Sequence, residues 1–198
     1  LETRISLAPP KEKICFDGER CSPWVRAPIW AEHLHRYLAV LPICDGRKLL
    51  DIACGEGYGA ALLAGAGAAH VSGVDIDAEI IARADRIYGS PNLDFHCASI
   101  LDPLPFEDDA FDLITCFETI EHVDAQQAAI AELCRVLQPG GILVISTPDK
   151  NHPSVQGSTN PFHEKELDET EFRALLAPHF SNVRACYQRN VTGSIMVD

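Results

Sequence analysis

Two apolar runs that each end in an acidic residue, with three alternating glycines between them, constrain this chain more than any other feature. The first run ends at Asp51 and is followed by Gly55, Gly57 and Gly59, and the second run ends at Asp75. This order predicts a strand, a loop that passes close to a ligand, a helix and a second strand. Because parallel strands end at the same edge of a sheet, we expect the loop and the second acid to meet at one ligand site.

Short apolar runs alternate with amphipathic segments along most of the chain. Strands are predicted over residues 48–53, 70–75, 92–97, 111–117, 141–147 and 182–188. Helices are predicted over residues 28–41, 58–66, 77–88, 124–137 and 168–178. This alternation is typical of parallel strands joined by right-handed helical crossovers. The expected fold is therefore an α/β doubly wound, mostly parallel sheet with helices on both faces.

The length of 198 residues is close to that of one domain. We expect a single domain over 1–198, with an N-terminal arm and lid helix over 1–44, a core sheet over 45–188 and an acceptor-side loop over 149–166.

Sixteen basic and 29 acidic side chains give a net charge of −13, which disfavours nucleic acid as a partner. No apolar run approaches the roughly 18 to 20 residues that cross a bilayer. Eight scattered cysteines without a CxxC pair predict buried reduced thiols and a cytoplasmic location.

The residue types around the glycines select between ligands. Gly55 and Gly57 let the backbone approach a ligand closely, and Asp75 can accept both hydroxyls of a ribose. A nicotinamide-binding fold uses the same acid but prefers the spacing GxGxxG, whereas these glycines are two residues apart. The carboxylate of Asp51 disfavours a pyrophosphate and suits a cationic group such as an amino-acid ammonium. An ordinary tight turn of an α/β protein is the alternative without a ligand.

These motifs resemble those of class I S-adenosylmethionine-dependent methyltransferases, which have a Rossmann-like sheet. The resemblance covers roughly residues 45–188, with further matches at LPF (104–106), FDLI (111–114) and LCRVLQPGGILVIST (133–147). It implies that Asp51, Gly55 and Gly57 hold the methionine part of S-adenosylmethionine, and that Asp75 and Ile76 hold the ribose and adenine. The other implied cofactor-binding residues are Ala53, Ser99, Ile100 and Phe117. Many relatives place an acid for the adenine amino group where this chain has Ser99 and Ile100.

A second group of polar residues follows the fourth predicted strand, in the segment FETIEH (117–122). If this segment is helical, Glu118, Glu121 and His122 project to one side, and His163 in the later loop can approach them from above. Two carboxylates and an imidazole suit a divalent metal ion such as Mg²⁺ or Mn²⁺. The motif resembles the ExxEH of metal-dependent methyltransferases that modify the terminal ribose of small RNAs. Ubiquinone-pathway O-methyltransferases carry a similar ExxEH for a catechol, and both acceptors are vicinal diols.

Three interpretations of this group remain open from the sequence alone. A bound cation lowers the pKa of a coordinated oxygen by several units, as it does for water from about 15.7 to about 7. Without a metal, His122 is the catalytic base and Glu118 or Glu121 orients it. In the third interpretation, the acids cap a helix N-terminus and interact favourably with its dipole.

The flanking segments narrow the choice of methyl acceptor. Residues 18–23, 32–37 and 160–167 resemble bacterial methyltransferases of cell-surface polysaccharide and O-antigen assembly, which are often encoded alongside or fused to glycosyltransferases. This resemblance implies O-methylation of a sugar hydroxyl in a bacterial glycan or a related vicinal diol, in a larger chain or complex with glycosyltransferases. The alternatives are N- or O-methylation of a small natural product or quinone precursor, a non-catalytic SAM-binding module, and a nicotinamide oxidoreductase. Residues 35–37 either form a solvated helix face or contact the cofactor carboxylate.

Overall fold

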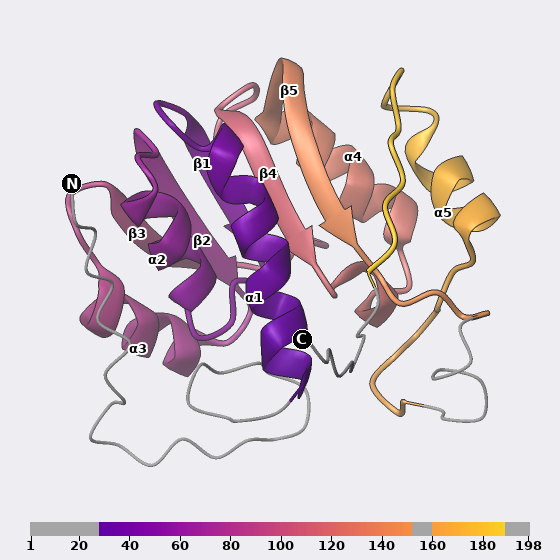
Figure 1. Ribbon diagram of the computed structural model, residues 1–198, viewed down its shortest axis with the longest axis horizontal. Helices are drawn as coiled ribbons and strands as arrows, with labels where there is room; N and C mark the ends of the chain where they lie inside the picture. Colours follow the sequence, from indigo (N-terminus) through magenta and orange to yellow (C-terminus); the bar gives the residue numbers. More distant parts are fainter. Residues whose placement is uncertain (1–27, 152–159, 189–198) are drawn as a thin grey trace, which may run out of the picture.

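The computed structural model describes residues 28–151 and 160–188. In these ranges five strands form one parallel sheet in the order β3-β2-β1-β4-β5 (Figure 1). The strands are β1 (Lys48–Ile52), β2 (His70–Asp75), β3 (Leu93–Cys97), β4 (Phe111–Phe117) and β5 (Leu137–Ser146). The helices are α1 (Pro28–Val40), α2 (Tyr58–Gly65), α3 (Ala78–Tyr88), α4 (Gln126–Val136) and α5 (Glu169–Leu176), with two 3₁₀ turns, η1 (Leu41–Ile43) and η2 (Ile120–His122). The predicted doubly wound parallel sheet is therefore confirmed.

The strand order changes direction between β1 and β4. From β1 the chain proceeds outward to β2 and β3, and it then returns to the other side of β1 to form β4 and β5. Such a switch point leaves a crevice beyond the carboxyl ends of the two central strands, because the following loops diverge. The loop after β1 and the segment after β4 therefore meet at one edge of the sheet.

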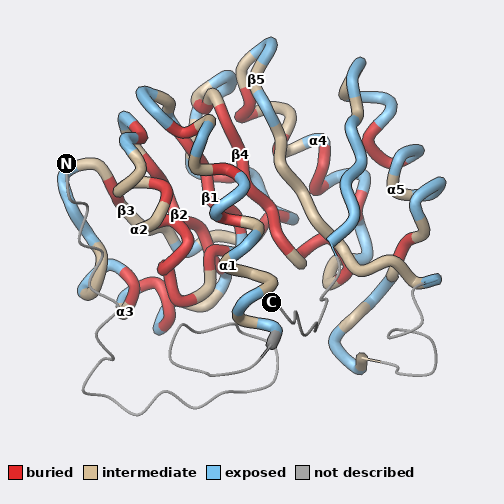
Figure 2. The backbone as a smooth tube through the Cα atoms, in the orientation of Figure 1, coloured by how far each residue is buried: buried red, intermediate tan, exposed pale blue. Residues whose placement is uncertain are grey.

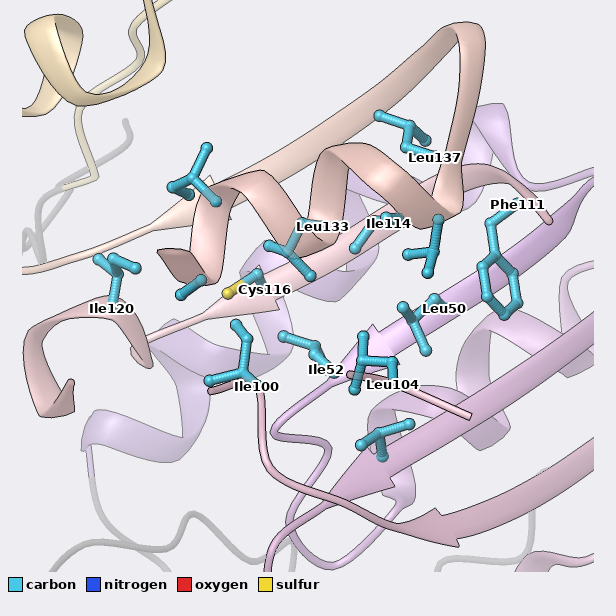
Figure 3. Close-up of a cluster of buried hydrophobic side chains, with 14 of the residues drawn as sticks. Leu50, Ile52, Ile100, Leu104, Phe111, Ile114, Cys116, Ile120, Leu133 and Leu137 are labelled. Carbon is cyan, nitrogen blue, oxygen red and sulfur yellow. The ribbon is translucent and has the colours of Figure 1, made fainter. Parts of the chain in front are cut away.

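Two clusters of buried apolar side chains cover the two faces of the sheet. Figure 2 shows long buried stretches of backbone along the central strands β1, β2 and β4. One cluster packs Leu133 of α4 against sheet residues such as Leu50 and Cys116 (Figure 3). The other packs α1 and α2 against the opposite face, through residues such as Leu49 and Leu63. The central strands are buried on both faces, which explains why they are near-continuous apolar runs in the sequence.

Two predicted strands differ from the structure. β5 begins at Leu137 instead of residue 141, because Leu137 pairs with Phe111 before the register shifts and Ile142 pairs with Leu113. Gly140, with φ of +80°, lies in the irregular stretch between these two pairs. The strand predicted at 182–188 is wrong, since these residues make no ladder within the described ranges.

Several expectations fall partly or wholly outside the described ranges. The N-terminal arm up to residue 27 and the middle of the predicted acceptor-side loop, 152–159, are among them. The six cysteines in the described ranges are free thiols, three of them buried. None of the helices in these ranges has both the length and the apolarity needed to span a membrane.

Candidate functional site

The loop between β1 and α2 forms the first part of the candidate site. Ala53, Gly55 and Gly57 have positive φ values of 53°, 52° and 79°. A Cβ at Gly57 would come within 2.8 Å of both Ala84 and Phe95, so this glycine permits close packing of the loop. A Cβ at Gly55 would meet no atom of the described residues within 4 Å, so this part of the chain leaves the space beside Gly55 open. Gly55 is therefore the position in this loop where the geometry lets a ligand approach the backbone.

Asp51 lies under this loop, near the carboxyl end of β1, and is fully buried. Its carboxylate accepts hydrogen bonds from the hydroxyl of Tyr37 (3.1 and 3.2 Å to the two oxygens) and from that of Thr115 (2.6 Å). Burial raises the pKa of Asp51 to about 7, although the two hydroxyl donors oppose this shift. Asp51 therefore joins α1, β1 and β4 directly at the switch point.

Asp75 closes the same site from the end of β2. One of its carboxylate oxygens accepts a hydrogen bond from the backbone N–H of Gly55 (2.9 Å), and the other accepts one from the N–H of Asp77 (3.1 Å). The next residue, Ile76, is 69% exposed and presents an apolar surface beside these acids. The two acids lie at the ends of neighbouring strands, as predicted, and both already hold donors of the chain itself.

Two expected adenine contacts, Ser99 and Ile100, follow β3 and have different environments. The hydroxyl of Ser99 accepts a hydrogen bond from the N–H of Leu101 (3.1 Å) and so stabilises a turn. Ile100 is buried in the cluster that also contains Ile52 and Cys116 (Figure 3). The side chain of Ile100 therefore belongs to the core.

Tyr37 of α1 is a site residue whose contact with Asp51 the sequence did not reveal. Its ring packs edge-on against Tyr58 and Phe117, with centroid distances of 5.6 and 5.1 Å. A Cβ at Gly59 would lie within 2.0–2.4 Å of the Tyr37 ring. The third glycine of the motif thus makes room for Tyr37 and not for a ligand. The sequence signal for this contact is that third glycine, which the loop itself does not need.

The segment after β4 is not an α-helix. Glu118 has φ of +49° and precedes the 3₁₀ turn η2, so the helical alignment considered from the sequence does not form. Its carboxylate accepts a hydrogen bond from the hydroxyl of Ser146 (2.6 Å) and lies 3.4 Å from a guanidinium nitrogen, Nη2, of Arg36. The Glu118 side chain is therefore held between β5 and α1.

Glu121, His122 and His163 do come together, and we call them the donor triad. One nitrogen or oxygen atom from each lies within 4.8 Å of the corresponding atoms of the other two. Glu121 is 1% exposed, and its Oε2 accepts a hydrogen bond from Thr147 (3.1 Å). Its Oε1 is buried and has no hydrogen-bond partner within the described part of the chain. Burial, reinforced by the nearby Glu118 carboxylate, raises the pKa of Glu121 to about 8.

Both imidazoles of the donor triad are oriented through Nδ1. The Nδ1 of His122 lies 3.0 Å from the carbonyl oxygen of Phe162, and the Nδ1 of His163 lies 2.7 Å from the carboxylate of Glu166. A proton on Nδ1 leaves the lone pair on Nε2, the usual arrangement in a metal-binding histidine. The Nε2 of His163 accepts a hydrogen bond from the side-chain amide of Asn160 (2.9 Å). Sequence reasoning missed the supporting roles of Glu166 and Asn160, although both stand in the segment 160–167.

The loop that carries His163 is fixed at its base and beside η2. Asp149 and Leu167 form a parallel bridge, so the two ends of the predicted acceptor-side loop are adjacent. The backbone N–H groups of Glu164 and Lys165 donate to the carbonyl oxygen of Glu121 (2.8 and 3.1 Å). These bonds place His163 over the segment that follows β4, as the sequence predicted.

The sequence is similar to one known family over part of its length and to several known proteins. Residues 50–145 match the family described as "Methyltransferase domain". A probable S-adenosylmethionine-dependent methyltransferase of Mycolicibacterium smegmatis is 35% identical over 163 residues, which are 80% of this chain and 62% of the relative. A ubiquinone biosynthesis O-methyltransferase of Thiobacillus denitrificans is 34% identical over 111 residues, 55% of this chain and 47% of the relative. The chain thus spans about three fifths or less of the length of these relatives.

The fold also resembles solved structures. The YcgJ protein of Bacillus subtilis matches with a TM-score of 0.65 and 25% identity, covering 74% of this chain and 68% of that one. The [4+2]-cyclase SpnF matches with a TM-score of 0.65 and 27% identity, covering 78% of this chain and 60% of that one. A likeness to a cyclase shows that this fold is not restricted to one reaction.

Proposed function

We propose that this chain carries a class I S-adenosylmethionine-dependent methyltransferase domain, and that it methylates a hydroxyl oxygen of a vicinal diol with the help of a divalent cation. The acceptor we favour is a sugar hydroxyl of a bacterial glycan, and a small-molecule diol such as a quinone precursor is the second candidate. The observation that carries the proposal is the donor triad, which lies on segments at the sheet edge that also holds Asp51. Similarity to ubiquinone biosynthesis O-methyltransferases supports an oxygen acceptor.

We place the cofactor on the side of the glycine loop where the space beside Gly55 is open. We assign the methionine part to the space beside Gly55, with its ammonium group toward Asp51, and the ribose and adenine to Asp75 and Ile76. Arg36 supports this orientation, because its Nη1 is buried and has no hydrogen-bond partner in the described ranges. A carboxylate is the natural acceptor for that nitrogen, so Arg36 is assigned to the carboxylate of the cofactor.

The donor triad fits a divalent transition metal. His122 offers its Nε2, and Glu121 offers the buried oxygen that lacks a partner within the described chain. The Nε2 of His163 accepts a hydrogen bond from Asn160, and a metal ion would replace this donor. Two histidines and one carboxylate suit Mn²⁺ better than Mg²⁺, which prefers oxygen ligands. Glu118, the fourth metal ligand predicted from the sequence, instead contacts Arg36 and Ser146 in the structure. A bound divalent cation lowers the pKa of a hydroxyl that it coordinates.

Residues of the chain would orient the acceptor and remove the proton of its hydroxyl group during methyl transfer. The acceptor oxygen bonds to the methyl carbon as the methyl–sulfur bond breaks, and the acceptor proton must leave. His122 either helps to hold the cation or, in a metal-free enzyme, accepts this proton at Nε2. Both roles use the same nitrogen atom, so metal dependence distinguishes them.

Transfer of a labelled methyl group from S-adenosylmethionine tests the proposed function. The acceptors are a catechol, a methyl glycoside with a free cis-diol and matched compounds with one hydroxyl blocked, each assayed with Mn²⁺ and with EDTA. We expect transfer to the diols alone and only with metal. Equal transfer to blocked acceptors in EDTA contradicts the metal-assisted mechanism and favours His122 as the base. Failure of S-adenosylhomocysteine to bind contradicts the whole proposal.

A further inference from the structure

We propose that Glu118 couples the cofactor pocket to the donor triad, so that binding of the cofactor strengthens binding of a divalent cation. In the structure, Arg36 and Ser146 hold the Glu118 carboxylate. When the cofactor carboxylate binds Arg36, it takes over this guanidinium and frees Glu118 to complete the cation site. The inference rests on the proposed function and adds a coupling between its two sites.

Arg36 has more N–H donors than the described residues around it accept. Its Nη2 lies 3.4 Å from Glu118 and 3.9 Å from Glu32, while its Nη1 is buried without a hydrogen-bond partner in the described ranges. The Arg36 side chain is only 15% exposed, so water does not easily satisfy that nitrogen. An arriving carboxylate can bond both terminal nitrogens in a bidentate pair, which the present contacts do not provide.

Glu118 lies outside the donor triad in the structure. The donor triad forms without it, although Glu118 precedes Glu121 by only three residues. Its φ of +49° is uncommon for a residue with a side chain, and its own N–H donates to the carbonyl oxygen of Ser146 (3.2 Å). This backbone and the hydroxyl of Ser146 direct the carboxylate toward Arg36. The Glu118 side chain therefore has a defined resting position outside the triad.

Electrostatics favour the same exchange. Where both groups are ionised and no cation is bound, the Glu118 and Glu121 carboxylates repel each other, and Arg36 stabilises Glu118 in its resting position. With a cation in the donor triad, both carboxylates are attracted to the same charge. Glu118 therefore pairs with the guanidinium or with the metal ion, and the cofactor carboxylate shifts the balance toward the metal ion. Because coupling between two sites is reciprocal, Mn²⁺ must tighten cofactor binding by the same factor.

Calorimetric titration of Mn²⁺ into the parent chain, with and without saturating S-adenosylhomocysteine, measures this coupling. We expect S-adenosylhomocysteine to raise the Mn²⁺ affinity about tenfold, within the usual range of such coupling. 5′-Methylthioadenosine provides a matched ligand, because it has the same nucleoside and thioether but no amino-acid carboxylate. It should bind and leave the Mn²⁺ affinity unchanged.

Three variants separate coupling from general damage to the site. Glu118→Gln should still bind S-adenosylhomocysteine, and its Mn²⁺ affinity should no longer respond to this ligand. Arg36→Gln should bind Mn²⁺ more tightly than the parent without any ligand, because Glu118 is already released. Glu32→Gln removes the other acid beside Arg36 and should keep the coupling of the parent. Binding of 5′-methylthioadenosine shows that each variant is folded.

The possible failures are distinguishable. Equal Mn²⁺ affinity with and without S-adenosylhomocysteine overturns the coupling, as does weaker Mn²⁺ binding by folded Arg36→Gln. If S-adenosylhomocysteine binds and Mn²⁺ does not bind under either condition, the coupling is also overturned, while a metal-free methyltransferase remains. If neither ligand binds the parent chain, the proposed function fails together with the inference.

Discussion

At the scale of single residues, the candidate site consists of buried acids whose charges depend on a few neighbouring donors. Asp51 is fully buried, and its donors among the described residues are two hydroxyl groups, those of Tyr37 and Thr115. Burial raises the pKa of Asp51, and these neutral donors lower it only in part, because they stabilise a buried carboxylate less than a positive charge does. A ligand ammonium beside Asp51 would supply the missing charge. The same environment that suits a cationic ligand therefore lowers the stability of the ligand-free chain at neutral pH.

The pH dependence of unfolding tests this state of Asp51. Its pKa is raised from the ordinary 3.8 to about 7 in the folded chain, so between these values the folded chain holds a proton that the unfolded chain lacks. The resulting stabilisation is lost as the pH rises toward 7. The free energy of unfolding of Asp51→Asn, measured with urea, should therefore increase relative to that of the parent chain between pH 4.5 and pH 8. The exposed variant Asp102→Asn should follow the parent, and parallel curves for Asp51→Asn and the parent contradict the prediction.

The second residue-scale prediction concerns Glu166, which orients His163 through Nδ1 at 2.7 Å. Loss of a carboxylate that supports a metal-binding histidine typically weakens metal affinity by about 10- to 100-fold. Glu166→Gln should therefore weaken Mn²⁺ binding by at least about tenfold in a calorimetric titration. Glu164→Gln is the matched control, because it removes the same charge from an exposed position two residues away. An equal effect of both substitutions would show that general charge, and not orientation of His163, sets the affinity.

At the scale of elements, α1 connects the two halves of the site. Tyr37 contacts Asp51 under the glycine loop, and its neighbour Arg36 pairs with Glu118 after β4. Figure 1 shows α1 lying over the face of the sheet near β1 and β4. Displacement of this helix should therefore disturb both the cofactor and the acceptor sides.

Gly59→Ala tests the docking of α1. The added Cβ would overlap the Tyr37 ring, with atoms 2.0–2.4 Å away, and such overpacking typically costs about 1–3 kcal/mol. We expect a matching loss in the free energy of unfolding and weaker binding of S-adenosylhomocysteine. The double variant Tyr37→Ala/Gly59→Ala provides the control, because removal of the ring should abolish the cost of the added methyl group. An unchanged cost in the Tyr37→Ala background would show that the strain arises elsewhere.

The sequence predicted most elements because hydrophobic periodicity reports burial against helices and neighbouring strands. β1, β2 and β4 are apolar runs that end at polar site residues, and their positions were predicted to within one or two residues. The start of β5 was misplaced because Pro139 resembles a stop signal, whereas it lies within the strand, in the irregular stretch between the pairs of Leu137 and Ile142. The segment 182–188 has a strand-like composition, but a strand also needs a pairing partner. Composition alone cannot show such a partner.

The sequence predicted those parts of the candidate site that the strand order positions. It did not predict the parts whose position depends on a single backbone dihedral angle. The loop after β1, Asp75 and the pairing of His122 with His163 follow from strands that end at a common edge. The Glu118 side chain lies outside the donor triad because its backbone has a positive φ, and no sequence pattern predicts this angle. The contact between Tyr37 and Asp51 depends on the docking of a helix from outside the motif.

At the scale of the whole molecule, the switch point between β1 and β4 concentrates the chemistry at one edge of the sheet. The net charge of −13 repels anionic polymers at long range, so we still predict a neutral or cationic acceptor in preference to nucleic acid. The likeness to a [4+2]-cyclase shows that the fold alone does not determine the reaction. The assignment therefore depends on the ligand that Asp51 and Asp75 bind.

Calorimetric binding of S-adenosylhomocysteine, with NAD as the competing candidate, tests this assignment most directly. We expect the parent chain to bind one S-adenosylhomocysteine and no NAD. Asp75→Asn, which keeps the side-chain size, should weaken S-adenosylhomocysteine binding by at least about tenfold, because charge-assisted hydrogen bonds to the ribose hydroxyls are lost. Binding of NAD in place of S-adenosylhomocysteine, or an S-adenosylhomocysteine affinity that Asp75→Asn leaves unchanged, would contradict the assignment of this site to S-adenosylmethionine.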